Sequence, residues 1–93
     1  MKAKLLLYTK EIKGDEIVEI KIWQLPKTRQ VKFSVVYIKS GKRLMGYDNA
    51  EGKGYHRHCG EKEETYHFEN IWKLLEDFKS DLKRLRRRDW DED

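Results

Sequence analysis

The sequence predicts one α+β domain in two layers, in which an antiparallel meander of four strands, or at most five, packs against one C-terminal helix. Two observations predict it. Apolar and polar residues alternate along the first half of the 93-residue chain, and near its end apolar residues recur every three or four positions. Alternation is typical of half-buried strands, and a helix with one apolar stripe must bury that stripe against another layer. We expect a single domain over residues 1–93, with a sheet over 3–48, a Gly/His loop over 49–62, a helix over 70–88 and an acidic tail over 89–93.

Turn residues separate the strands that we expect in the first half. Gly14-Asp15 is a turn signal, and Pro26 ends a strand because proline cannot donate to a ladder. Ser40-Gly41 is a two-residue hairpin turn, since its glycine takes a positive φ readily. The segments between these turns are rich in β-branched and aromatic residues. We therefore expect strands over residues 3–13, 17–25, 31–39 and 42–48.

A single helix is expected after this sheet. Asn70 is a suitable N-cap. The arginines at 86–88 suit the negative end of a helix dipole. Because the apolar side chains in between form one stripe, the helix should lie across one face of the sheet. The stripe consists of Ile71, Leu74, Leu75, Phe78, Leu82 and Leu85.

Charge and cysteine content limit the class of protein. Residues 1–60 contain 13 Lys and Arg against 6 Asp and Glu, a net charge of +7, whereas residues 61–93 have a net charge of −3. A basic sheet and loop suggest an anionic partner such as RNA, although a solvated Lys/Glu-rich surface gives the same composition. One cysteine excludes an intramolecular disulfide, and no apolar run is long enough for a membrane span. We expect a cytoplasmic protein that does not bind membranes.

The stretch from Tyr47 to Gly60 is the strongest candidate for a functional site. It contains three of the six glycines, two of the three histidines and the only cysteine. His56 and His58 are two residues apart, so in an extended segment their side chains point the same way, while Arg57 points oppositely. Such a concentration of glycine and histidine indicates a role other than filling a core.

Cleavage of a phosphodiester is the first chemistry that fits these residues. His56 and His58 would act as general base and general acid, with Asp48 beside them. Basic side chains would hold the phosphate, arginine through its bidentate fork, and the Gly-Lys-Gly backbone would cradle it. The candidate binding residues are Arg43, Asn49, Gly52, Lys53, Gly54 and Arg57.

Two other interpretations stay open at this stage. No cofactor is required for the acid–base chemistry, but a divalent metal would suit His56 and His58 together with Glu64, or with Asp48 or Cys59. Alternatively, the two histidines form hydrogen bonds that only support the structure or lie on the surface without a role.

The same stretch resembles the TumE family of small toxins from toxin–antitoxin pairs. The resemblance implies a cytoplasmic toxin that is encoded beside a DNA-binding antitoxin, but it assigns no catalytic residues. It rests on the pattern Tyr47-Asp48-Asn49-Ala50-x-Gly52-x-Gly54-x-His56-x-His58-x-Gly60, followed by Glu64-x-Tyr66-x-Phe68 and Leu74-Leu75-x-Asp77-Phe78.

The leading hypothesis is therefore a toxin that acts on RNA as a small nuclease. The rival hypothesis is a non-catalytic module that binds nucleic acid or a protein. Because a meander has two edges and the chain is short, we also expect a homodimer.

Overall fold

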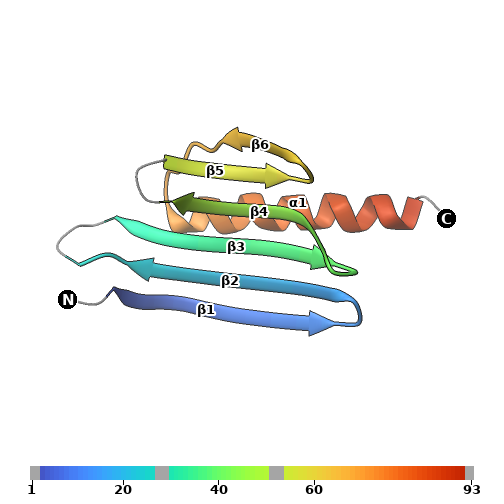
Figure 1. Ribbon diagram of the computed structural model, residues 1–93, viewed down its shortest axis with the longest axis horizontal. Helices are drawn as coiled ribbons and strands as arrows, with labels where there is room; N and C mark the ends of the chain where they lie inside the picture. The colour runs from blue at the N-terminus through green and yellow to red at the C-terminus, as the bar shows by residue number, and fades with distance from the viewer. Residues whose placement is uncertain (1–2, 27–29, 51–53, 92–93) are drawn as a thin grey trace.

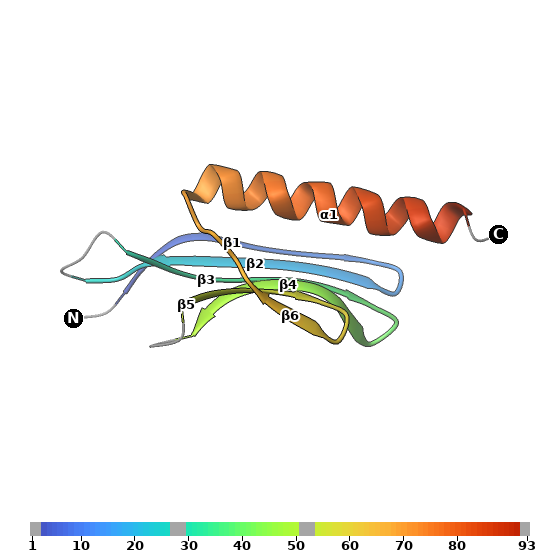
Figure 2. The same ribbon diagram turned by 90° about the horizontal axis from the view of Figure 1, so that it is seen from above.

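A six-stranded antiparallel sheet and one helix form the computed structural model, which describes residues 3–26, 30–50 and 54–91. The strands follow one another in chain order across the sheet, and Figure 1 shows this meander with the helix behind it. Figure 2 shows the two layers from above, with the helix on one face of the sheet. The elements are β1 (Lys4–Lys13), β2 (Glu16–Gln24), β3 (Val31–Lys39), β4 (Lys42–Ala50), β5 (Gly54–Cys59), β6 (Lys62–Thr65) and α1 (Ile71–Asp91).

The α+β class is confirmed, but the predicted strand count of four or five is wrong. The segment expected to be a Gly/His loop over 49–62 contains the end of β4, all of β5 and the beginning of β6. Glycine content favoured a loop, whereas Gly54 and Gly60, both with positive φ, lie at the ends of β5 and leave its interior extended. The helix continues to Asp91, three residues beyond its expected end, and residues 92–93 of the expected tail lie outside the described residues.

The hydrophobic core lies between α1 and one face of the central strands. Because side chains alternate along a strand, each strand contributes every second residue to this face, here called the helix face. The other face of the sheet is called the open face (Figure 2). The buried core residues are Val18, Ile22, Val31, Phe33, Val35, Tyr37, Met45, Tyr47, Leu74 and Phe78.

Local signals fix the turns and the start of the helix as expected. Ser40 and Gly41 both have positive φ, at 52° and 78°, which is the type I′ geometry that matches strand twist. Asn70 caps α1, since its Oδ1 accepts a hydrogen bond of 2.9 Å from the backbone N–H of Lys73. No helix in the described part of the chain has the length and hydrophobicity that crossing a membrane requires.

Candidate functional site on the open face of the sheet

Alternation along β5 separates the histidines from the arginine between them. In the antiparallel register, Arg57 lies opposite Tyr47, a core residue, and therefore belongs to the helix face. His56 and His58 lie opposite Asp48 and Gly46 and belong to the open face. The sequence-based prediction that both histidines point the same way agrees with this register.

Each of the two histidines contacts a carboxylate on a neighbouring strand. Nδ1 of His56 lies 3.2 Å from Oε1 of Glu63 on β6, and Nε2 of His58 lies 3.2 Å from Oδ2 of Asp48 on β4. The imidazole rings are mostly buried, with side-chain exposures of 21% and 16%. A carboxylate at one ring nitrogen fixes the orientation of the ring, which is how catalytic histidines are commonly held.

A bulge in β4 brings Arg43 to the same face. Ile38 lies opposite Arg43 while Tyr37 lies opposite Met45, so one extra residue of β4 is accommodated between them. Without this bulge Arg43 would share the helix face with Met45, and bulges commonly redirect side chains in this way.

The stem of Arg43 runs over Gly46. A Cβ at Gly46 would lie 3.5 Å from Cδ of Arg43, and Gly46 itself is opposite His58. Within residues 3–26, 30–50 and 54–91, the exposed guanidinium of Arg43 has no ion-pair partner. A guanidinium that no described carboxylate engages, on the same face as two imidazoles, is suited to binding a phosphate.

Arg57, which the sequence suggested as a phosphate ligand, is instead engaged on the helix face. Its Nη2 donates to Oδ1 of Asp81 at 3.1 Å, its Nε donates to the hydroxyl of Tyr47 at 3.2 Å, and its Nη1 donates to Glu64. Burial opposes its charged form, but the hydrogen bonds to Asp81, Tyr47 and Glu64 outweigh burial and raise the pKa of Arg57. These contacts give Arg57 a role in joining β5 to α1.

Asn49 also makes structural hydrogen bonds. Its Oδ1 accepts from the backbone N–H of Phe33 and its Nδ2 donates to the carbonyl of Val31, each at 2.8 Å. The β3–β4 ladder ends at the pair Ser34–Asp48, so this amide satisfies β3 backbone groups beyond the ladder. Gly52 and Lys53 lie outside the described residues, and Gly54 begins β5 with a φ of 76°.

The metal-binding alternative loses Glu64 as a ligand. Glu64 lies opposite Arg57 and therefore on the helix face, away from His56 and His58. Among the described residues, no group of three or more His, Cys, Asp and Glu side chains is arranged to hold a metal ion. The metal set of His56, His58 and Glu64 is thus not brought together.

Asp81 is the structural residue that the sequence interpretation missed. It follows Leu74 and Phe78 at helical spacing, so it lies on the buried stripe of α1, and its side chain is only 9% exposed. The sequence does contain a signal for this role, because Asp81 is a single carboxylate within an apolar stripe. A charge buried in this way requires a partner that is also buried. That partner is Arg57.

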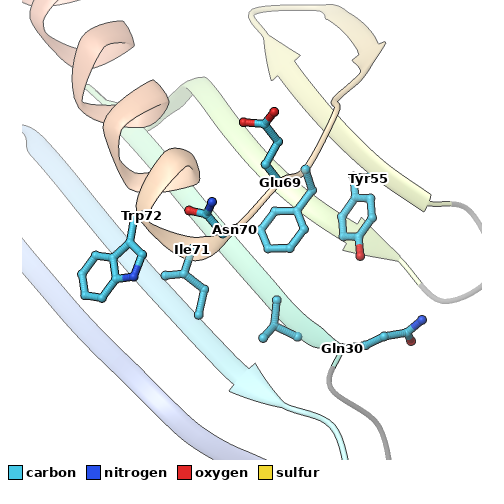
Figure 3. Close-up of a pocket in the computed structure, with 8 residues that line it drawn as sticks. Gln30, Tyr55, Glu69, Asn70, Ile71 and Trp72 are labelled. Carbon is cyan, nitrogen blue, oxygen red and sulfur yellow. The ribbon is translucent and has the colours of Figure 1, made fainter.

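A second candidate is a pocket of about 480 Å³ at the start of α1 (Figure 3). Tyr55 and Phe68 stack in its wall with ring centroids 4.9 Å apart. No Lys or Arg lines the part of this pocket that the structure describes, so it is poorly suited to a phosphate, and it includes none of the residues singled out in the sequence. Its lining consists of Gln30, Val31, Tyr55, Phe68, Glu69, Asn70, Ile71 and Trp72.

Comparison with known protein families gives a match that covers most of the chain. The chain is similar over residues 2–86 to the family described as Toxin TumE, and the match includes every described residue of the open-face site. No curated protein and no solved structure gives a significant match to the chain.

Proposed function

Because the chain belongs to the TumE toxin family, the toxin components of toxin–antitoxin systems, we propose that it acts by cleaving RNA at the open face of its sheet. Family membership implies a cognate antitoxin. That this antitoxin binds DNA, that the toxin is cytoplasmic and that it forms a homodimer stay predictions. The observation that best supports cleavage is the grouping of Arg43, His56 and His58 on one face.

The proposed reaction uses the two imidazoles in turn. One neutral imidazole accepts the proton of a ribose 2′-hydroxyl, whose oxygen attacks the adjacent phosphorus. The other imidazole, protonated, donates its proton to the departing 5′-oxygen as the P–O bond breaks. The products are a 2′,3′-cyclic phosphate and a free 5′-hydroxyl, so charge and protons balance between the two histidines.

The spacing of the residues suits this reaction. Alternate residues on a strand are about 7 Å apart, which leaves room for a phosphate that receives a hydrogen bond of about 2.8 Å from each side. Asp48 and Glu63 act as positioning residues because each contacts one ring nitrogen. Arg43 would neutralise the phosphate and stabilise the charge that develops in the transition state.

The rest of the open face offers a surface for the nucleic-acid strand. Tyr8 and Trp23 lie on this face, and Lys21 and Lys32 lie close to them in the register. Nζ of Lys21 is 5.9 Å from the ring centroid of Tyr8. Aromatic rings stack with unpaired bases and lysines neutralise phosphates, so RNA affinity should fall steeply as salt rises.

The test is cleavage of a single-stranded RNA oligonucleotide by the purified chain, with a DNA oligonucleotide of the same sequence as substrate control. We expect a 2′,3′-cyclic phosphate product from RNA and no cleavage of DNA, since DNA lacks the 2′-hydroxyl. His56→Ala and His58→Ala should each reduce the rate by roughly 10²–10⁴-fold. His67→Ala, which changes the third histidine outside the site, should leave the rate unchanged.

Thermal unfolding of each variant separates a chemical defect from a folding defect. The histidine variants should melt close to wild type, because neither imidazole belongs to the hydrophobic core on the helix face. Wild-type cleavage by the His56→Ala/His58→Ala double variant would overturn the assignment. Loss of wild-type cleavage on addition of a chelator would overturn the two-imidazole mechanism in favour of a metal. RNA binding without cleavage would support the rival hypothesis of a binding module.

A further inference from the structure

The two edges of the sheet differ in how they are protected. β6 is only four residues long, and three of its residues are charged, which discourages pairing with another strand. β1 is ten residues long and pairs only with β2 in the described part of the chain. Its outer side therefore presents a long row of backbone donors and acceptors at the lower edge of the sheet in Figure 1.

The exposed apolar side chains of the molecule are concentrated on this same strand. Of the five large hydrophobic residues that are exposed in the described part of the chain, four belong to β1: Leu5, Leu6, Tyr8 and Ile12, with exposures of 52%, 42%, 51% and 65%. Single exposed apolar residues are ordinary, but a strip of them along one edge indicates a surface that a partner covers.

Charge identifies the kind of partner. β1 contains three lysines and one glutamate, and Lys10 shares the open face with Tyr8 and Ile12. A second copy of the chain would place a strand of net charge +2 beside another of +2, and like charges across a strand pair are destabilising. A strand with acidic side chains opposite the lysines and apolar side chains opposite Tyr8 and Ile12 would instead pair with the lysines and cover the exposed apolar residues.

We propose that the β1 edge binds an extended acidic segment of another protein, which adds to the sheet as an antiparallel strand. Backbone hydrogen bonds would supply affinity, and alternate side chains would supply specificity. A toxin requires a cognate antitoxin, and an acidic segment of that antitoxin is the occupant that this edge fits. Docking at β1 does not require the chain to cleave RNA, so failure of either idea leaves the other intact.

The test uses the full chain and a synthetic probe, a fluorescein-labelled peptide of about ten residues, long enough to match β1. The peptide has glutamate at the positions opposite the lysines of β1 and valine at the positions opposite its exposed apolar residues. We expect saturable binding by fluorescence polarisation. A peptide with lysine in place of glutamate should not bind. A peptide with alternate N-methylated amides should bind at least tenfold more weakly, because it cannot complete the ladder.

Variants locate the binding surface. Lys10→Glu should weaken peptide binding about fivefold, the effect of losing roughly 1 kcal/mol of ion pairing. Lys83→Glu makes the same charge change at an exposed position of α1 and should have no effect. Both variants should melt like wild type.

Hydrogen exchange on the wild-type chain gives a second measurement that needs no variant. The peptide should slow exchange of β1 amides and leave β6 amides unchanged. Absence of peptide binding, equal binding of the lysine peptide, or protection at β6 instead of β1 would overturn the proposal. So would protection of the β1 amides in the absence of peptide, in a sample that sediments as a dimer, because a second copy of the chain would then occupy this edge.

Discussion

Arg57 and Asp81 are 24 positions apart in sequence, yet two hydrogen bonds join them across the interface between β5 and α1. Nη2 of Arg57 donates to Oδ1 of Asp81 at 3.1 Å, and Nε donates to Oδ2 at 3.4 Å. The hydroxyl of Tyr47 also donates to this carboxylate, and Arg84 approaches it from the exposed side. Asp81 therefore holds both the last hairpin and the end of β4 against the helix.

Replacing Asp81 should destabilise the protein strongly. Asp81→Ala leaves the charge of Arg57 buried without its main partner, and breaking such a pair costs about 3 kcal/mol or more. Arg84→Ala removes a largely exposed arginine from the same carboxylate and should cost less than about 1 kcal/mol. Urea unfolding of both variants measures the difference. Equal losses of unfolding free energy in the two variants would mean that the contact between Arg57 and Asp81 does not stabilise the fold.

Phe78→Ala should cost about 3–5 kcal/mol of unfolding free energy, as large aromatic truncations in a core do. Phe78 is 2% exposed and packs edge-on against Tyr47 with ring centroids 6.2 Å apart. Trp72→Ala is the matched control, because Trp72 is an aromatic residue of the same helix that is 78% exposed. It should change stability by no more than about 0.5 kcal/mol. A loss below about 1 kcal/mol for Phe78→Ala would contradict the packing of α1.

Gly46→Val should reduce RNA cleavage roughly tenfold to a hundredfold while leaving stability nearly unchanged. A valine at this position would displace the stem of Arg43 and fill the space opposite His58. Stability should change little, because the extended backbone at position 46 suits a β-branched residue. Gly46→Ala is the control, since its Cβ would meet its neighbours at ordinary contact distances and activity should be retained. Full activity of Gly46→Val would show that the position of Arg43 does not matter for cleavage.

Acid should destabilise the protein partly through Glu16. The hydrogen bond from Tyr37, at 2.5 Å, and the nearby Arg86 lower the pKa of Glu16 below its ordinary value of 4.5. Because the pKa is lower in the folded state, this stabilisation is complete above about pH 4.5 and is lost as pH falls through the folded-state pKa. On the Tyr37 side, burial and the hydrogen bond to Glu16 raise the pKa of the phenol to about 12.

Urea unfolding between about pH 5 and pH 3 checks this linkage. The Glu16→Gln variant should be less stable than wild type at about pH 5. As the pH falls toward about 3, its unfolding free energy should decrease less than that of wild type. Glu11→Gln, an exposed carboxylate of β1, should follow the wild-type curve. If the unfolding free energy of Glu16→Gln fell with pH in parallel with that of wild type, Glu16 would not contribute to acid destabilisation.

The sequence was sufficient for the strands and the helix whose periodicity is strong. Alternation in residues 31–39 and the stripe after Asn70 correspond to β3 and α1, and the Ser40-Gly41 turn lies between β3 and β4. β5 escaped prediction because its alternation is between histidine and a mixture of tyrosine, arginine and cysteine rather than between polar and apolar residues. A search for alternating apolar and polar residues misses such a strand, because an ion-paired arginine occupies a position on its helix face where an apolar residue is expected.

The site was only partly predictable for a related reason. The two-residue spacing of His56 and His58 indicated that they share a face, since this depends only on strand period. Their contacts with Glu63 and Asp48, and the placement of Arg43 on the same face, depend on the register of two hairpins and on a bulge. Register and bulges are set by tertiary packing, so no pattern in the sequence distinguishes the role of Arg43 from that of Arg57.

The alternation along β5 also constrains how this hairpin can change in evolution. Insertion of one residue between Gly54 and Arg57 would shift the strand's parity, placing Arg57 toward solvent and one histidine under the helix. Both the anchor to Asp81 and the paired imidazoles would be lost in one event. Insertion of two residues would restore the parity. Homologues that keep both features should therefore differ in length along this strand by even numbers of residues, or contain a bulge like that of β4.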